Sequence, residues 1–119
     1  MIKQEFVPYE EAFALKELGF NEPCFGYWKS KNWLIQEKTR TDGYTHADQE
    51  CPAPIYQQAF KWFREKYNLS SWIYNSDMTK FFYTILQNGR IVKSHNSSTT
   101  YEEAELACLI KLIEIVKKK

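Results

Sequence analysis

The chain has 119 residues, of which 44% are hydrophobic and 17% aromatic, and its formal net charge is +1. This length and composition predict a single packed domain over residues 1–119 and exclude a disordered tail or linker. The near-zero charge provides no overall field toward nucleic acid or an acidic membrane, and no apolar run reaches the length of a membrane span. We therefore expect no membrane partner, and nucleic acid is an unlikely one.

Cysteine usage and the amino-terminal residues indicate the compartment. Cys24, Cys51 and Cys108 are odd in number, widely spaced and without a C-x-x-C pair. No apolar segment typical of a signal peptide follows Met1. The sequence therefore predicts a reduced cytoplasmic protein whose cysteines act as small apolar residues.

The first half of the chain predicts a helix followed by a hairpin. Pro8 favours a helix start and Gly19 a helix end, so we expect a helix over about residues 8–18. Aromatic and branched residues on both sides of the turn 29–32 predict two strands joined as a hairpin. Residues 44–47 could return as a third strand, and 51–54 forms a rigid approach to the next element.

The second half, residues 54–117, predicts the order helix, three strands, helix. Pro54 favours the first position of a helix that ends at Asn68 in a left-handed conformation. The strands of the meander are expected from 71, over 81–87 and over 90–95, and Asn88-Gly89 is the strongest short hairpin signal in a sequence. Thr100 and Glu103 form a capping box at the start of the last helix. The fold class is α+β, with a mostly antiparallel sheet (a hairpin plus a three-stranded meander) packed by helices.

The two-residue turn at 88–89 predicts which residues of the hairpin share a face. The turn fixes the register, so Ile85 faces Val92 and Phe82 faces His95. The more apolar face, with Phe81, Tyr83, Ile85 and Val92, should lie under the helices, and Trp72 and Tyr74 join it if Asn75 pairs with Lys80. The other face carries Phe82, Thr84, Leu86, Ile91, Lys93 and His95. Three of them are the candidate ligand-binding residues, because aromatic rings beside basic groups can stack on bases or hold anions: Phe82, Lys93 and His95. An ordinary half-exposed sheet face, or one covered by residues 38–53, is the alternative interpretation.

The last helix is apolar around most of its circumference. Its polar stripe consists of Glu103, Lys111, Glu114 and Lys118. Such a helix must be covered on more than one side, by the sheet and then by either the first helix or a second copy of the chain. We therefore expect self-association through the candidate interface residues Leu109, Leu112, Ile113 and Val116.

The sequence contains no pattern typical of catalysis or of cofactor binding. His46, Asp48, Glu50 and Cys51 are metal-ligand types in one loop, but their spacing matches no zinc pattern, so we expect no metal and no cofactor. Cys51 beside His46 is the one conceivable nucleophile and base, and a solvated loop is the preferred interpretation. The chain is accordingly predicted not to be an enzyme.

Four stretches carry a resemblance that spans most of the chain: residues 5–11, 15–25, 53–67 (APIYQQAFKWFREKY) and 101–116 (YEEAELACLIKLIEIV). They resemble a family of small proteins from gut anaerobic bacteria and their phages or other mobile elements, a family with no assigned activity. The resemblance implies a bacterial or phage-related cytoplasmic protein and transfers no functional residue.

The element order of residues 54–117 is also similar to that of the double-stranded-RNA-binding domain. That domain places lysines at the start of its last helix, whereas this chain has Glu102, Glu103 and Glu105 there. The sequence thus favours a small non-enzymatic interaction module, with a nucleic-acid-binding protein of this topology as the alternative.

Overall fold

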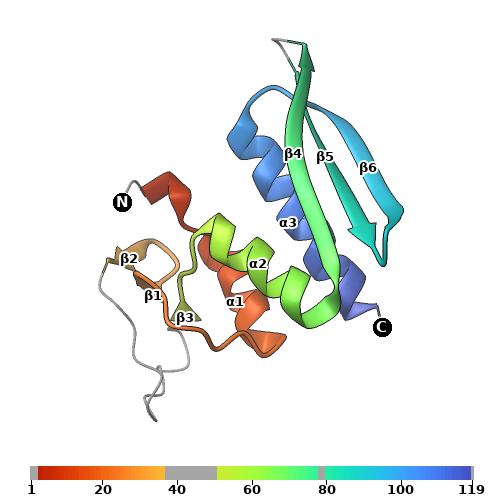
Figure 1. The fold of residues 1–119 in the computed structure, drawn as a ribbon. Coiled ribbons are helices and arrows are strands. Elements are labelled where there is room, and N and C mark those ends of the chain that lie inside the picture. The colour runs from red at the N-terminus through yellow and green to blue at the C-terminus, as the bar shows by residue number, and fades with distance from the viewer. Residues whose placement is uncertain (1–2, 37–50, 78–79, 119) are drawn as a thin grey trace. The chain divides into compact units, whose positions relative to one another are not determined.

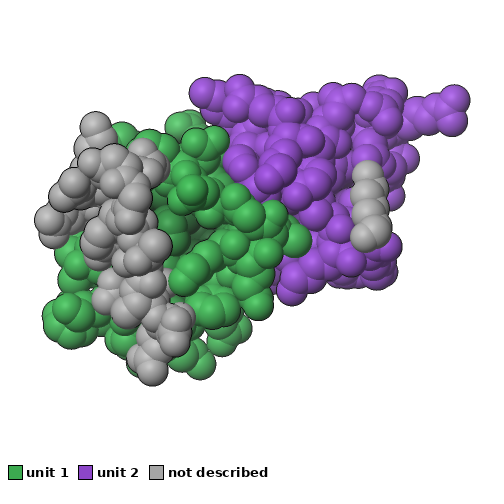
Figure 2. All heavy atoms as spheres, turned by 90° about the horizontal axis from the view of Figure 1, so that it is seen from below, with its two compact units in different colours: residues 1–59 green, residues 60–119 purple. Residues whose placement is uncertain are grey.

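The computed structural model describes residues 3–36, 51–77 and 80–118. Within them the chain forms three α-helices and two three-stranded antiparallel sheets (Figure 1), which confirms the predicted α+β class. The chain divides into two compact units, residues 1–59 and 60–119 (Figure 2). Each unit is described separately, and the single domain expected from chain length stays a prediction.

The first unit combines helix α1 with a small sheet. A single 3-10 turn, η1 (Lys3–Glu5), precedes α1 (Tyr9–Glu17), and the sheet has the order β2-β1-β3. Its strands are β1 (Tyr27–Ser30), β2 (Trp33–Ile35) and β3 (Cys51–Pro52). The predicted first helix and hairpin are therefore confirmed. Pro8 stands at the N-cap of α1, and Gly19 follows the helix with a φ of 103°, a backbone conformation that suits glycine.

The first unit is held together by buried apolar side chains and a few backbone bonds. The backbone N–H of Val7 donates to the carbonyl of Pro54 at 2.8 Å, and the buried indole N–H of Trp28 donates to the carbonyl of Val7 at 2.9 Å. Burial of that N–H without a partner would be costly, so this bond fixes the position of Trp28. The prediction that residues 51–54 form only an approach to the next element is wrong. Cys51–Pro52 pairs with Tyr27–Trp28 as the third strand of the sheet. The predicted strand over 44–47 lies outside the described residues.

Helix α2 (Tyr56–Tyr67) begins in the first unit and continues into the second. It starts two residues after Pro54, so the prediction that Pro54 occupies the first helical position is wrong. The exit is as predicted: Asn68 has a φ of 57°, in the left-handed region that asparagine tolerates. The side-chain amide of Asn68 also donates to that of Asn88, which ties the end of α2 to the β-hairpin turn.

The second unit contains a three-stranded meander and the last helix. Its strands are β4 (Leu69–Asp77), β5 (Lys80–Gln87) and β6 (Arg90–Ser98), in the order β4-β5-β6. Helix α3 (Tyr101–Lys117) contacts all three strands and lies against one face of the sheet (Figure 1). The predicted order helix, three strands, helix is confirmed.

Two local signals of the second unit act as the sequence predicts. Asn88 and Gly89 take positive φ values of 53° and 81°, as a two-residue turn requires, and Gln87 pairs with Arg90 across it. The hydroxyl of Thr100 accepts from the backbone N–H of Glu103 at 3.1 Å. The Glu103 carboxylate in turn accepts from the hydroxyls of Thr99 and Thr100, and these bonds lower its pKa. The start of α3 is thus fixed by its capping box.

Candidate functional site

The sheet of the second unit has one face against α3 and one face turned away from it. We call the second the outer face and define it by Trp72, Tyr74, Phe82, Leu86 and Ile91. The register places these residues together, because Tyr74 pairs with Phe82 and Leu86 with Ile91, and directly opposite residues of an antiparallel pair share a face. On the face against α3, Tyr83 and Ile85 are buried.

The register between β5 and β6 differs from the predicted one. The pairs Gln87–Arg90 and Leu86–Ile91 follow the turn as expected, but Ile85 then pairs with Lys93 rather than Val92. The prediction was wrong because a β-bulge inserts Val92 as an extra residue, and a shift of one residue moves later side chains to the opposite face. Val92 is 45% exposed instead of buried.

The register between β4 and β5 also differs. Asp77, and not Asn75, pairs with Lys80, and an irregularity between Asn75 and Asp77 then pairs Asn75 with Phe81. The predicted burial of Trp72 and Tyr74 depended on the Asn75–Lys80 pair and is wrong, since these side chains are 48% and 39% exposed. The sequence placed Phe82, Leu86 and Ile91 on the correct face but assigned both exposed aromatic residues of β4 to the interior.

The three candidate ligand-binding residues do not share a face. Phe82 is half-buried on the outer face, where its ring stacks on that of Tyr74 with centroids 5.5 Å apart and an interplanar angle of 21°. Lys93 pairs with buried Ile85 and therefore belongs to the face against α3. The backbone of His95 pairs with Tyr83 rather than with Phe82. The predicted cluster of an aromatic ring with two basic groups is therefore not formed.

The outer face is instead an apolar surface with aromatic and aliphatic members. Ile91, at 68% exposure, is the most accessible of its residues. Between them Thr84 is buried, and its hydroxyl shares a hydrogen bond of 3.4 Å with that of Ser94, the residue opposite. The hydroxyls of Thr84 and Ser94 thus satisfy each other, and the large exposed side chains of the face are aromatic and aliphatic: Trp72, Tyr74 and Ile91.

The predicted self-association residues lie in the interior of the chain. These four side chains are all buried: Leu109, Leu112, Ile113 and Val116. The helix contacts β4, β5 and β6, so the sheet contributes to this cover. A second copy is therefore not needed to remove these residues from water, and self-association through α3 stays a prediction.

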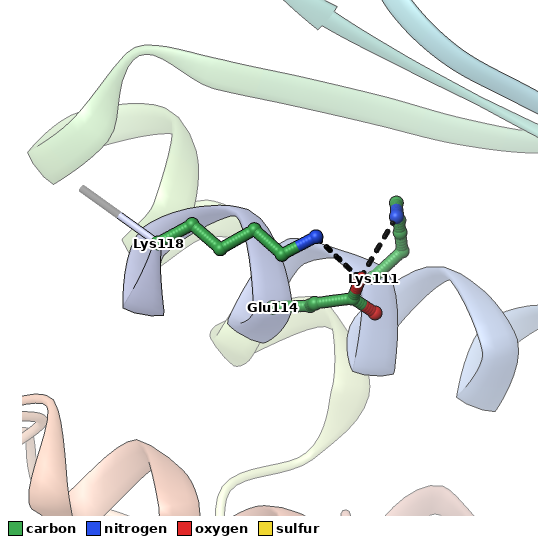
Figure 3. A network of polar contacts seen from close by, with 3 residues as sticks. All are labelled: Lys111, Glu114 and Lys118. Atoms are coloured by element: carbon green, nitrogen blue, oxygen red, sulfur yellow. Dashed lines mark hydrogen bonds and ion pairs between the residues drawn. The ribbon is translucent and has the colours of Figure 1, made fainter.

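The polar stripe of α3 is present as expected. One carboxylate oxygen of Glu114 accepts from the ammonium groups of Lys111 and Lys118, both at 3.1 Å (Figure 3). These bonds lower the pKa of Glu114. Ile110 departs from the prediction, because this apolar residue is 44% exposed. The network is a surface feature of the helix, and exposed ion pairs contribute little to stability.

The cysteines are poor candidates for catalysis. All three are buried thiols that form no disulfide, and burial raises the pKa of each to about 12. The reactive species of cysteine is the thiolate, so at neutral pH these groups are protonated and weakly nucleophilic. The remaining metal-ligand candidates, His46, Asp48 and Glu50, lie outside the described residues; inside them, no three His, Cys, Asp or Glu side chains group as a metal site.

Comparisons of the chain with protein-family models, with curated proteins and with solved structures found no match. In the part of the chain that the structure describes, no helix has both the length and the apolar character needed to cross a membrane.

Proposed function

We propose that this protein is a small non-enzymatic interaction module whose binding surface is the outer face of the second unit's sheet. The observation that carries the proposal is the exposure of Trp72, Tyr74 and Ile91 on one face of a sheet whose other face packs on α3. Contiguous exposed apolar patches are uncommon on monomeric proteins and mark interaction sites. Tryptophan and tyrosine are also the residue types that most often dominate binding energy.

The chemistry of the outer face favours a protein partner with an apolar contact surface. None of its five defining residues carries a charge. The rings of Tyr74 and Phe82 stack on each other, so each already uses one ring face inside the protein. Exposed Lys80 and Arg90 stand at the ends of β5 and β6 and suit a polar rim around an apolar centre.

The same features support a protein without catalytic activity. They also support a location in the bacterial cytoplasm, with the protein encoded by the bacterium or by one of its mobile elements. The three thiols are buried and protonated, which removes the strongest nucleophiles from the surface. Three cysteines that form no disulfide also fit a reducing compartment. The bacterial or phage-related origin rests on the family resemblance of the sequence.

Affinity capture with paired variants tests the proposal. Wild-type protein, Ile91→Ser and Ile110→Ser are immobilised and exposed to lysate of the native host. Ile110 is the matched control, because it is also an exposed isoleucine of the second unit but belongs to α3. We expect a discrete protein that wild type and Ile110→Ser retain and Ile91→Ser loses. Equal retention by all three would place the binding surface elsewhere.

A nucleic-acid binder is the second candidate function. The order α2-β4-β5-β6-α3 favours it, since it matches the element order of the double-stranded-RNA-binding domain. The start of α3 opposes it, because exposed Glu102 and Glu103 stand where phosphate contacts would form. We expect fluorescence anisotropy to show no binding to duplex RNA or DNA at physiological salt. Submicromolar duplex binding that is lost on Lys93→Glu would reverse the order of the two candidates.

A further inference from the structure

The sheet of the second unit has two edge strands, β4 and β6, since β5 lies between them. An edge strand offers backbone N–H and C=O groups to any further strand, and proteins normally block such edges with charges, prolines or bulges. We propose that β4 pairs edge to edge with β4 of a second copy of this chain, antiparallel and about a two-fold axis at Trp72. This assembly goes beyond the proposed function, which concerns the outer face.

Strand β6 has the protection expected of an edge that must not pair. Its register with β5 is interrupted in two places, between Ile85 and Leu86 and between Phe81 and Tyr83 on the partner strand. Bulges bend and twist a strand away from the flat geometry that pairing needs. It also carries Arg90 and Lys93, basic residues of the kind that blunt edges.

Strand β4 lacks these devices over most of its length. From Leu69 to Asn75 its register with β5 runs without interruption, and the irregularity comes only after Asn75. This stretch, LSSWIYN, contains no charged residue and no proline. Trp72, Ile73 and Tyr74 are residue types with high strand propensity. The contrast between the two edges of one sheet indicates that β4 is left open for a strand.

The uninterrupted stretch also fixes the symmetric register. The middle residue of 69–75 is Trp72, so a two-fold axis there places Trp72 opposite Trp72 of the second copy. Ser70 then lies opposite Tyr74 of the second copy, and the interface is the same patch on both chains. An axis perpendicular to the sheet keeps both α3 helices on one side. The two outer faces become one continuous face over six strands, with an aromatic pair at its centre.

Charge exchange at position 72 tests this pairing. Trp72→Lys and Trp72→Glu each place like charges opposite each other across the axis, which is unfavourable. Light scattering coupled to size exclusion should show a wild-type dimer and a dimer dissociation constant raised at least about tenfold in each variant. An equimolar mixture should recover the dimer, because the introduced ammonium and carboxylate then face each other. Recovery also shows that both variants are folded.

Ile91→Lys is the control, since it adds a charge to the outer face on β6, away from the proposed edge. It should remain a dimer. A monomeric wild type at high micromolar concentration overturns the proposal. It is also overturned if Ile91→Lys dissociates the dimer as much as Trp72→Lys does and the mixture of Trp72→Lys with Trp72→Glu does not recover the dimer. A monomer that binds an extended peptide along β4 would assign the edge to another protein and overturn the self-pairing.

Disulfide trapping tests the register independently of charge. Trp72→Cys should cross-link two copies under mild oxidation, because opposite residues of an antiparallel pair lie within disulfide range. Tyr74→Cys should not, since the two copies of position 74 would be four residues apart along the strands, about 13 Å. The native cysteines are buried and do not compete. Efficient cross-linking at 74 and none at 72 would refute the axis at Trp72.

Discussion

The bulge at Val92 decides which side chains of the hairpin are buried, and two matched substitutions test it. Threonine is introduced at Ile85 and, separately, at Val92. In an unbulged hairpin these residues face each other and share the buried face; in the structure Ile85 is fully buried and Val92 is exposed. Threonine is β-branched like both residues it replaces, so strand propensity changes little and burial dominates the result.

The magnitudes follow from the two environments. Ile85→Thr removes buried carbon and places a hydroxyl against α3, which should lower the free energy of unfolding by about 2–4 kcal/mol. Val92→Thr puts a hydroxyl in water and should change it by no more than about 0.5 kcal/mol. The expected difference is a large fraction of the stability of a small domain.

Urea denaturation of the full chain, followed by circular dichroism, measures both values. The slope with urea should be similar for wild type and both variants, because a changed slope would indicate a changed unfolded or native state. If Val92→Thr lowers the free energy of unfolding as much as Ile85→Thr does, the bulge is absent and the outer face is wrongly assigned.

Three further predictions concern the first unit and the cysteines. Burial is the largest cause of the raised pKa of Glu11; a backbone hydrogen bond opposes it, and the neighbouring charge of Glu10 adds a smaller increase. A carboxyl group whose pKa is raised by folding contributes stability at low pH, and this stability is lost as pH rises through the raised pKa. Glu11→Gln should therefore raise the melting temperature at pH 7 and not at pH 3. A rise at pH 3 and none at pH 7 would contradict this reasoning. Gly26→Ala should destabilise the fold by roughly 1–3 kcal/mol, because the added Cβ would lie 2.8 Å from the carbonyl oxygen of Ile35. An unchanged urea midpoint would show that the backbone at Ile35 moves to accommodate the methyl group without loss of stability. Iodoacetamide at pH 8 should leave all three thiols of the native protein unmodified and alkylate them in urea, as intact-mass spectrometry would report; rapid alkylation of the native protein would mean that a cysteine is accessible.

The sequence was sufficient where a structure is determined by neighbouring residues. Asn88-Gly89 predicts its turn because few residues tolerate two successive positive φ values, and Asn68 and Thr100 mark helix ends for similarly local reasons. These signals were enough to predict the order of elements in the second unit and the α+β class.

Strand register was not predictable in the same way. No short pattern in the sequence encodes the bulge at Val92 or the Asp77–Lys80 pair. Each error was of one residue, yet each moved a set of side chains to the opposite face, since side chains alternate along a strand. The outer face was therefore predicted in part: Phe82, Leu86 and Ile91 were assigned to it, whereas Trp72 and Tyr74 were not. The strand at Cys51–Pro52 was missed because two residues carry no alternation.

Site-specific photo-crosslinking in the native host tests the central claim most directly. A photoreactive amino acid is introduced at Ile91 on the outer face and, in a second strain, at Ile110 on α3; both positions are exposed in the second unit. The account predicts a discrete cross-linked protein from position 91, at a mass different from twice the 14.2 kDa chain, and none from position 110. A discrete partner from position 110 with none from position 91 would contradict the assignment of the outer face as the binding surface.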